Sequence, residues 1–224
     1  MLGCDAKGLE ARMEAHHCYT YPGGIEYAEA MLGDKDNDVH VQNAKLWGLY
    51  KPDGSVDRSA AKSPKYALTY GAQPPKLAET MGIYTNEARE YFNKFWEGNT
   101  ALSGFRDDTL EEWRCSNHTL LGLDGRLLKS RSAHSLVNLK FQSSGSIIVK
   151  WATVKLIEDI KRRKLDAQMV IHYHDEFQFE VGEKDVEKVK ELALKAFTDA
   201  GLWYKMNVPI EGDVKIGRSW KETH

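Results

Sequence analysis

Two adjacent carboxylates, Asp175 and Glu176, lie between two apolar runs of the stretch Met169–Gly182. β-Branched and aromatic residues fill positions 170–173, and large apolar residues alternate with polar ones over positions 177–181. An alternation of period two is typical of a half-buried strand. We therefore predict a β-hairpin whose tip carries the two acids.

The two carboxylates at this tip repel each other, so the sequence must offer something that compensates them. A solvated acidic turn is the simpler interpretation. The apolar flanks favour the other one, a divalent cation held by oxygen atoms. A hairpin supplies only one side of such a site. Asp5 is the candidate for the other side, since a short strand is predicted to end there and a helix to begin near Lys7; a helix N-cap is the alternative role for Asp5.

Asp5 and Asp175 are 170 positions apart, and each is predicted to lie at a strand end. Two such acids can bracket a pair of Mg²⁺ ions about 3.5–4 Å apart. One ion would activate an attacking hydroxyl and the other would neutralise a leaving pyrophosphate. A rival hypothesis is a metal hydrolase that uses His172, His174 and Asp175 as transition-metal ligands, but no further His or Cys stands at ligand spacing.

A second group of residues could bind an anion. Arg58, Lys62, Tyr66 and Tyr70 are spaced by four, so on a helix they lie close to one face. Two cations followed by two aromatic rings suit a negatively charged ligand with a flat ring, such as a nucleotide. A surface helix whose two tyrosines pack inward remains an equal alternative.

Composition bounds the class of protein. The chain has 224 residues, enough for one large domain or two small ones, and 42% of them are hydrophobic, enough for a substantial core. No apolar run approaches the roughly 18 residues of a membrane span, and no signal-peptide core follows Met1. The three cysteines show no paired spacing. We expect reduced cysteines, no membrane segment and a cytoplasmic protein.

Positive charge is concentrated in one part of the chain. Residues 114–164 hold eleven Lys and Arg against three Asp and Glu, a net +8 in a chain of net −2. This basic tract predicts a polyanionic partner such as nucleic acid. A solvated helix end explains residues 161–164 equally well. It does not explain the scattered cations Arg126, Lys129, Arg131, Lys140 and Lys150.

Local patterns predict the remaining elements. Asp185–Ala200 has an apolar stripe at helical spacing and is followed by Gly201, and Thr85 is the expected N-cap of another helix. The expected elements are helices over 39–47, 85–95 and 185–200, a hairpin over 120–131, a helical region over 135–163 with a potential break at 143–145, and a closing strand over 208–216.

Three motifs occur in a fixed order: Asp5–Arg12, then Arg58-x3-Lys62-x3-Tyr66-x3-Tyr70-Gly71, then His174-Asp175-Glu176. They resemble motifs A, B and C of family A (DNA polymerase I-like) DNA polymerases, nearest to the phage replicative type. Supporting matches are Asp38-x-His40, Leu123-Asp124-Gly125-Arg126, Arg131-x2-His134-x3-Asn138-x3-Gln142 and the ending from Val208 to His224. The resemblance covers nearly the whole chain and corresponds to the family's C-terminal polymerase region.

The resemblance implies an α+β fold, an antiparallel-sheet palm with an inserted α-helical fingers subdomain. Residues 1–36 would form the first part of the palm, 37–130 the fingers and 131–224 the second part of the palm. Asp5, Asp175 and Glu176 would be the catalytic residues. Two Mg²⁺ ions would be bound by Asp5, Asp175 and the carbonyl of Ala6, with Glu176 in support.

The resemblance also assigns substrate contacts. Arg58 and Lys62 would grip the triphosphate, which His40 would also reach. Tyr66 would stack near the sugar, Tyr70 would stack at the template side of the nascent pair, and Glu10 would be the steric gate against a ribose 2′-OH. The expected DNA contacts are Arg131, His134, Asn138 and Gln142 on the template or minor groove, and His174 near the primer end.

The implied function is template-directed DNA synthesis, the transfer of nucleotides from dNTPs to a primer 3′-OH on primer–template DNA. A degenerate fragment that binds primer–template without turnover is the alternative. Because Met1 precedes Asp5 by only four positions, we expect a second polypeptide that carries a thumb, with or without an exonuclease; a chain that simply begins at a convenient Met is the plain alternative. The expected location is the cytoplasm, that of the host if the protein is phage-encoded.

Pro64 departs from the family pattern because it falls inside the motif B helix. Proline removes a backbone donor and clashes with the carbonyl four residues back, which costs about 3 kcal/mol in a regular helix. Either the helix is kinked at Pro64, or Ser63 caps a new helix with Pro64 at its first position. In the second case Arg58 and Lys62 are not rigidly coupled to Tyr66.

Overall fold

A computed structural model describes residues 1–33 and 38–224. The chain divides into two compact units, one formed by residues 1–13 and 143–224 and the other by residues 14–142. We call them the sheet unit and the helical unit. The boundaries fall inside helices α1 (Leu9–Cys18) and α8 (Leu136–Arg163).

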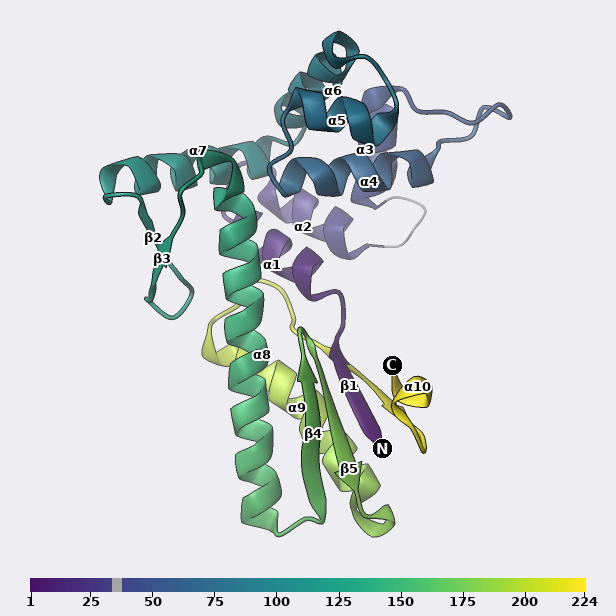
Figure 1. The fold of residues 1–224 in the computed structure, drawn as a ribbon, viewed down its shortest axis with the longest axis vertical. Coiled ribbons are helices and arrows are strands. Elements are labelled where there is room, and N and C mark those ends of the chain that lie inside the picture. Colours follow the sequence, from purple (N-terminus) through teal and green to yellow (C-terminus); the bar gives the residue numbers. More distant parts are fainter. Residues whose placement is uncertain (34–37) are drawn as a thin grey trace. The chain divides into compact units, whose positions relative to one another are not determined.

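The sheet unit is built on a four-stranded sheet in the order β4-β5-β1-β6, with every neighbouring pair antiparallel (Figure 1). The strands are β1 (Leu2–Ala6), β4 (Ala167–Tyr173), β5 (Glu176–Val181) and β6 (Gly212–Ile216). The predicted hairpin is confirmed as β4 and β5, and the predicted strand at Asp5 is the inner strand β1. The α+β class with an antiparallel sheet is therefore confirmed.

Helix α9 (Val186–Trp203) packs on this sheet. The ring of Phe197 stacks on Phe177 of β5 at 5.3 Å between centroids and 7° between planes. The predicted helix end at Gly201 is wrong, because α9 continues through Gly201 to Trp203. A Cβ at Gly201 would lie 2.9 Å from Ile210 Cγ1, so this glycine permits close packing and does not stop the helix.

Helix α8 is continuous, so the potential break at residues 143–145 is wrong. A Cβ at Gly145 would lie 3.1 Å from Leu9 Cδ2 in α1. The small residue lets the two helices approach, and the serines beside it do not end the helix. Strand β6 is shorter than the predicted 208–216 and begins at Gly212. Pro209, which has no N–H for a ladder, lies before it.

The helical unit confirms the helix over 39–47 and the second hairpin. Its elements are α2 (Gly24–Leu32), α3 (Val39–Trp47), α4 (Arg58–Thr69), α5 (Pro74–Met81), α6 (Thr85–Gly98), α7 (Thr100–Cys115), β2 (Thr119–Leu121), β3 (Leu127–Lys129) and the 3₁₀ turn η1 (Ala133–Ser135). Tyr84 occupies the N-cap position of α6, so the predicted cap at Thr85 is wrong by one residue. Trp47 and Phe95 stack between α3 and α6 at 5.9 Å.

Helix α4 runs without interruption through Pro64, so the alternative in which Ser63 caps a new helix is wrong. Asp57 is the N-cap, and its Oδ1 accepts a hydrogen bond from the Ala60 amide at 3.0 Å. The cations of the motif therefore share one helix with Tyr66.

Two short elements complete the sheet unit, the 3₁₀ turn η2 (Glu183–Asp185) and helix α10 (Trp220–Thr223). The predicted subdomain boundary between residues 36 and 37 lies outside the described residues, and the boundary at 130/131 stays a prediction. Within residues 1–33 and 38–224, no helix is both long and apolar enough to span a membrane.

Candidate active site

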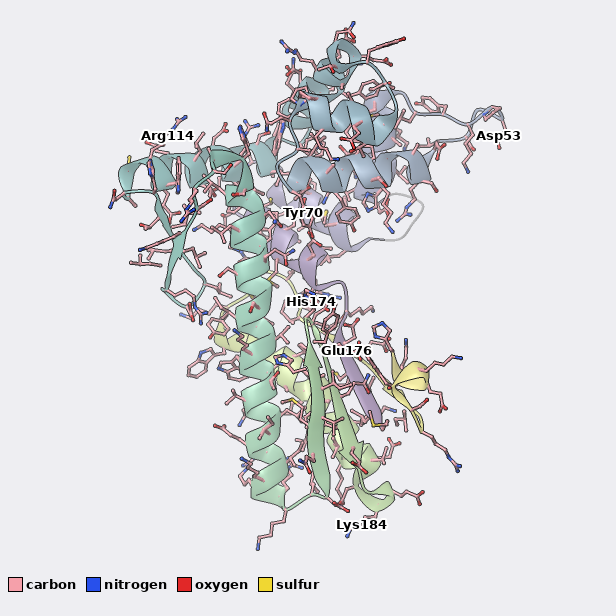
Figure 2. All side chains as sticks on the ribbon, in the orientation of Figure 1. Asp53, Tyr70, Arg114, His174, Glu176 and Lys184 are labelled. Atoms are coloured by element: carbon pink, nitrogen blue, oxygen red, sulfur yellow. The ribbon has the colours of Figure 1, made fainter. Side chains whose placement is uncertain are left out.

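The tip of the β4–β5 hairpin is a two-residue turn, His174 and Asp175, since Tyr173 pairs with Glu176. Figure 2 shows His174 and Glu176 at this end of the hairpin and Lys184 at the opposite end. His174 has a positive φ of 53°, an uncommon conformation for a residue other than glycine. Such backbone conformations are concentrated at functional sites, where surrounding structure holds them in place.

The position of β1 places Asp5 between two further carboxylates. Asp5 pairs with Glu176 of β5 on one side and with Asp213 of β6 on the other. The Ala6 amide donates to the Asp175 carbonyl at 3.0 Å, which fixes the hairpin tip beside the end of β1. Like charges directly opposite each other destabilise an antiparallel sheet. The fold therefore brings four acids together at one end of the sheet, a costly arrangement without a cation.

Sequence reasoning missed Asp213. Its strand was predicted, but the residue opposite Asp5 follows from the register of β1 with β6, which local patterns do not contain. A cavity of about 240 Å³ is lined by Asp5, Asp175, Glu176 and Asp213, with Lys215 as the nearby cation. Partial burial, and then the negative charges of Asp175, Glu176 and Asp213, raise the pKa of Asp5 to about 6.

Glu176 lies in a different environment from its neighbour Asp175. It is buried, and its Oε1 accepts hydrogen bonds from Trp220 Nε1 at 3.0 Å and from the Gln178 amide. Its Oε2 lies 2.5 Å from His224 Nδ1. Burial alone would raise the pKa of Glu176, but the hydrogen bonds from Gln178, His224 and Trp220 hold it below the ordinary value.

Helix α10 explains why β5 is not the half-buried strand that its alternation predicts. Gln178 is buried, and its Oε1 accepts from Thr223 Oγ1 at 2.7 Å. The polar face of β5 is thus covered by α10 near the hairpin tip. Glu176 is therefore buried beneath polar groups of the C-terminal segment. Asp5 is exposed and Asp175 is half-buried in the wall of the cavity.

The carboxylate oxygens of this site are the kind of ligand that a hard cation such as Mg²⁺ prefers. Among the residues that the structure describes, no group of three or more His, Cys, Asp or Glu side chains could hold a metal ion by itself. The His172–His174 hydrolase site therefore has no supporting ligand set. Mg²⁺ usually takes one or two carboxylates and completes its shell with water and substrate phosphate. Asp5 and Asp175 match that requirement.

In the helical unit, Arg58 is held by Asp38. The Asp38 Oδ1 caps α3 by accepting from the amides of His40 at 3.0 Å and Val41 at 3.1 Å, and its Oδ2 accepts from Arg58 Nε at 2.9 Å. Burial opposes ionisation of Asp38, but the hydrogen bonds from Arg58 and Val41 hold its pKa below the ordinary value. The guanidinium is thereby fixed at the start of α4.

His40 lies beside Tyr66, with ring centroids 5.6 Å apart. Burial, and then the positive charge of Lys65, lower the pKa of His40, which keeps the ring neutral at neutral pH. Its Nδ1 is buried and has no hydrogen-bond partner within the described ranges. Lys62, on α4, is exposed. The structure thus places His40 of α3 beside Tyr66 of α4, the helix that Arg58 begins.

The predicted DNA contacts of the helical unit lie at the other end of α4. Gln142 Nε2 donates to Tyr70 Oη at 3.2 Å, and Figure 2 marks Tyr70 at this helix end. Asn138, four residues before Gln142 on α8, has a buried Oδ1 without a partner in the described chain. Arg131 and His134 are exposed just before α8.

The remaining predicted residues belong to the sheet unit. Glu10 has a buried Oε1 that finds no partner among residues 1–33 and 38–224. His174 is exposed, and its ring lies edge-on to Tyr173 at 4.6 Å. Ala6 is buried in β1. The roles expected for Glu10 as steric gate, for the Ala6 carbonyl as metal ligand and for His174 near the primer end stay predictions.

Comparison with known proteins agrees with this arrangement. Residues 1–222 match the model of DNA polymerase family A. The chain belongs to DNA polymerase family A. It is 29% identical over 254 residues to the DNA-directed DNA polymerase of Escherichia phage Phieco32, a match that covers 100% of this chain and 40% of the relative. It is 28% identical over 233 residues to DNA polymerase I of Helicobacter pylori, covering 99% of this chain and 25% of that protein.

Among solved structures, the family A chain is similar to the POL domain of Pol1 from M. smegmatis, which was solved in complex with DNA primer-template and dNTP. The TM-score is 0.80 at 23% identity, over 99% of this chain and 40% of that one. This likeness establishes the fold. The chain spans between a quarter and two fifths of the length of the relatives named here.

The crowded carboxylates predict how stability depends on pH. The pKa of Asp5 rises from an ordinary 3.8 to about 6 on folding. The folded state therefore binds this proton more tightly, and its stability falls as pH rises from about 4 to 6. We expect Asp5→Asn to raise the melting temperature at pH 7.5 in EDTA, with the gain vanishing near pH 4.

The control for this measurement is Glu191→Gln, which removes one exposed negative charge from α9 of the same unit. It should leave the melting temperature within about a degree at both pH values. An Asp5→Asn protein that melts below wild type at pH 7.5 would contradict the assignment of repulsion at this site.

Proposed function

We propose that the chain carries out template-directed DNA synthesis by transferring nucleotides from dNTPs to the 3′-OH of a primer, with two Mg²⁺ ions as cofactors. The single observation that supports this best is the meeting of Asp5 and Asp175 at one end of the sheet, where Asp213 and Glu176 make the site strongly acidic. The relatives named DNA-directed DNA polymerase and DNA polymerase I support the same activity.

When bound, the ions would lower the pKa of the attacking hydroxyl and neutralise the leaving pyrophosphate. Asp5 and Asp175 hold them, together with the carbonyl of Ala6. Glu176 contributes negative charge beside this pair without binding an ion directly. Both of its carboxylate oxygens already have hydrogen-bond partners, in Gln178, Trp220 and His224.

The helical unit binds the dNTP. Lys62 and Arg58 contact the triphosphate, and His40 reaches it as a neutral donor. Tyr66, fixed beside His40, stacks near the sugar.

The basic tract of residues 114–164 binds the DNA backbone. Tyr70 and Gln142, joined by a hydrogen bond, contact the template side of the nascent pair. Arg131, His134 and Asn138 contact the template or minor groove, and His174 lies near the primer end. The protein works in the cytoplasm, that of the host if a phage encodes it.

A degenerate fragment that binds primer–template without turnover is the second candidate. The observation in its favour is Pro64 inside α4, the helix that carries the nucleotide contacts. The uninterrupted course of α4 from Arg58 to Thr69 favours the enzyme.

Asp175→Asn should abolish primer extension, by about a thousandfold or more, because a neutral amide cannot supply the charge that holds the ions. Primer–template affinity, measured by fluorescence anisotropy, should stay within a few-fold. The matched control is Glu180→Gln, which neutralises an exposed acid on the same hairpin. Extension at near wild-type rate by Asp175→Asn would rule out the two-metal proposal, and a wild-type chain that binds DNA without extending it would favour the second candidate.

Glu10→Ala should increase the use of ribonucleotides relative to deoxyribonucleotides by about tenfold, since the side chain proposed to exclude the 2′-OH is removed. The buried and unpartnered Oε1 of Glu10 supports a role other than surface solvation. Competition between rGTP and dGTP in single-nucleotide extension measures the ratio. Glu26→Ala, an exposed acid on α2, is the control. An unchanged ratio for Glu10→Ala would remove the gate assignment.

We also propose that a thumb-bearing second polypeptide, with or without an exonuclease, covers an apolar face of the sheet unit. Trp151 of α8 stacks on Trp203 of α9 at 5.8 Å, and Trp203, Leu202 and Val154 are exposed by 67%, 72% and 57%. Side chains of this size gathered on one face are typical of a protein–protein contact.

The isolated chain of 224 residues should therefore self-associate or extend primers poorly, and Trp203→Ser with Leu202→Gln should make it monodisperse. Size-exclusion chromatography with light scattering and a primer-extension assay measure the two properties. A wild-type chain that is a stable monomer and extends primers efficiently by itself would exclude the second polypeptide.

A further inference from the structure

One lysine of the helical unit is completely buried. Lys65 of α4 has no solvent exposure, and its Nζ forms an ion pair with Glu14 Oε2 at 2.5 Å, itself 1% exposed. The Tyr27 hydroxyl donates to the other carboxylate oxygen of Glu14 at 2.5 Å. Three helices, α1, α2 and α4, thus contribute one residue each to a buried polar network.

Stability alone is a weak reason for this network. Taking two charges out of water is costly, and well-packed apolar side chains of similar volume are often as stable as a buried ion pair or more so. An ion pair fixes the relative position of the two elements that carry it, because the partners must meet at one distance and orientation. The position of Lys65 in α4 indicates which part of the helix is fixed.

Lys65 directly follows Pro64. Proline has no N–H, so the carbonyl of Ala60 lacks the helical hydrogen bond that residue 64 would otherwise supply. The link between the half of α4 that carries Arg58 and Lys62 and the half that carries Tyr66 is therefore weakest at this turn. The Glu14–Lys65 pair fixes the helix at that point.

Lys65 also lies close to Tyr66, the residue proposed to stack near the sugar of the nucleotide. Its Nζ lies 5.2 Å from the centre of the Tyr66 ring, within cation–π distance. The Tyr66 ring in turn lies beside His40 at 5.6 Å. A contiguous set of contacts thus runs from Glu14 through Lys65 to Tyr66 and His40.

We propose that Glu14, Lys65 and Tyr27 are positioning residues for the incoming nucleotide, which hold α4 in one register across Pro64 and fix Tyr66 and His40 in place. The proposal rests on the proposed function of α4. None of the three residues touches the nucleotide; they act through the helix and through Tyr66.

The test separates positioning from stability. Lys65→Met alone leaves the Glu14 charge buried and unpaired, and should lower the melting temperature by about 10 °C. The triple variant Glu14→Leu, Tyr27→Phe, Lys65→Met leaves no polar atom of the network and should melt close to wild type. In the triple variant we expect the amides of residues 65–69 to exchange hydrogen about tenfold faster than in wild type, with α6 unchanged. In single-nucleotide extension, KM for dNTP should rise about tenfold while kcat stays within about threefold.

The matched control is Lys76→Met with Glu79→Leu, which removes an exposed ion pair of 2.8 Å on α5 in the same unit. It should change neither exchange in α4 nor KM. A triple variant that is stable and shows wild-type exchange and wild-type KM would overturn the proposal, since the network would then be merely structural. If the wild-type chain extends no primer, the proposed function fails, and amide exchange in α4 alone still decides whether the network anchors the helix.

Discussion

Repulsion among carboxylates at one end of the four-stranded sheet is the constraint on which the sheet unit depends. Asp5 is flanked by Glu176 and Asp213 through direct cross-strand pairing, and Asp175 is tied to the end of β1 by a backbone hydrogen bond. The ladder bonds and the packing of α9 on the sheet must offset this repulsion. Proteins retain destabilising repulsion of this kind mainly at functional sites. A set of oxygen ligands with net negative charge is what a hard divalent cation prefers.

In the helical unit, three cations of α4 lie in three different environments. Arg58 is fixed by the same carboxylate that caps α3, so the start of α4 and the start of α3 are tied together. Lys65 is fixed by Glu14 in the interior. Lys62, between them, is exposed. A helix with two anchored cations and one exposed cation can present the exposed one to a phosphate without moving as a whole, which limits the entropy lost on binding.

Local sequence patterns predicted individual helices, strands and turns. The β4–β5 hairpin, the strand at Asp5 and the helix at 39–47 follow from local residue patterns. Contacts distant in sequence were missed. Asp213 faces Asp5 only through the β1–β6 register, and Gln178 is buried because α10 covers it, 45 positions later. Gly145 and Gly201 are breakers by local chemistry, yet each is a packing position against another segment, so the helices continue through them. The candidate site residues were predicted from the order and spacing of the three motifs. Periodicity describes one helix or strand at a time and does not show which residues of different elements meet.

The cross-strand neighbours Asp5 and Glu176 show how one fold gives two acids different environments. They pair directly across β1 and β5, yet the pKa of Asp5 is raised and that of Glu176 is lowered. The difference comes from the donors: Glu176 has the Trp220 indole, the Gln178 amide and the His224 ring, whereas Asp5 has mainly other carboxylates around it. An acid whose charge is already satisfied gains little from a metal ion, and an acid whose charge is opposed gains much. Under the proposed two-metal mechanism, Asp5 would therefore gain more from a bound cation than Glu176, whose charge is already stabilised by hydrogen bonds.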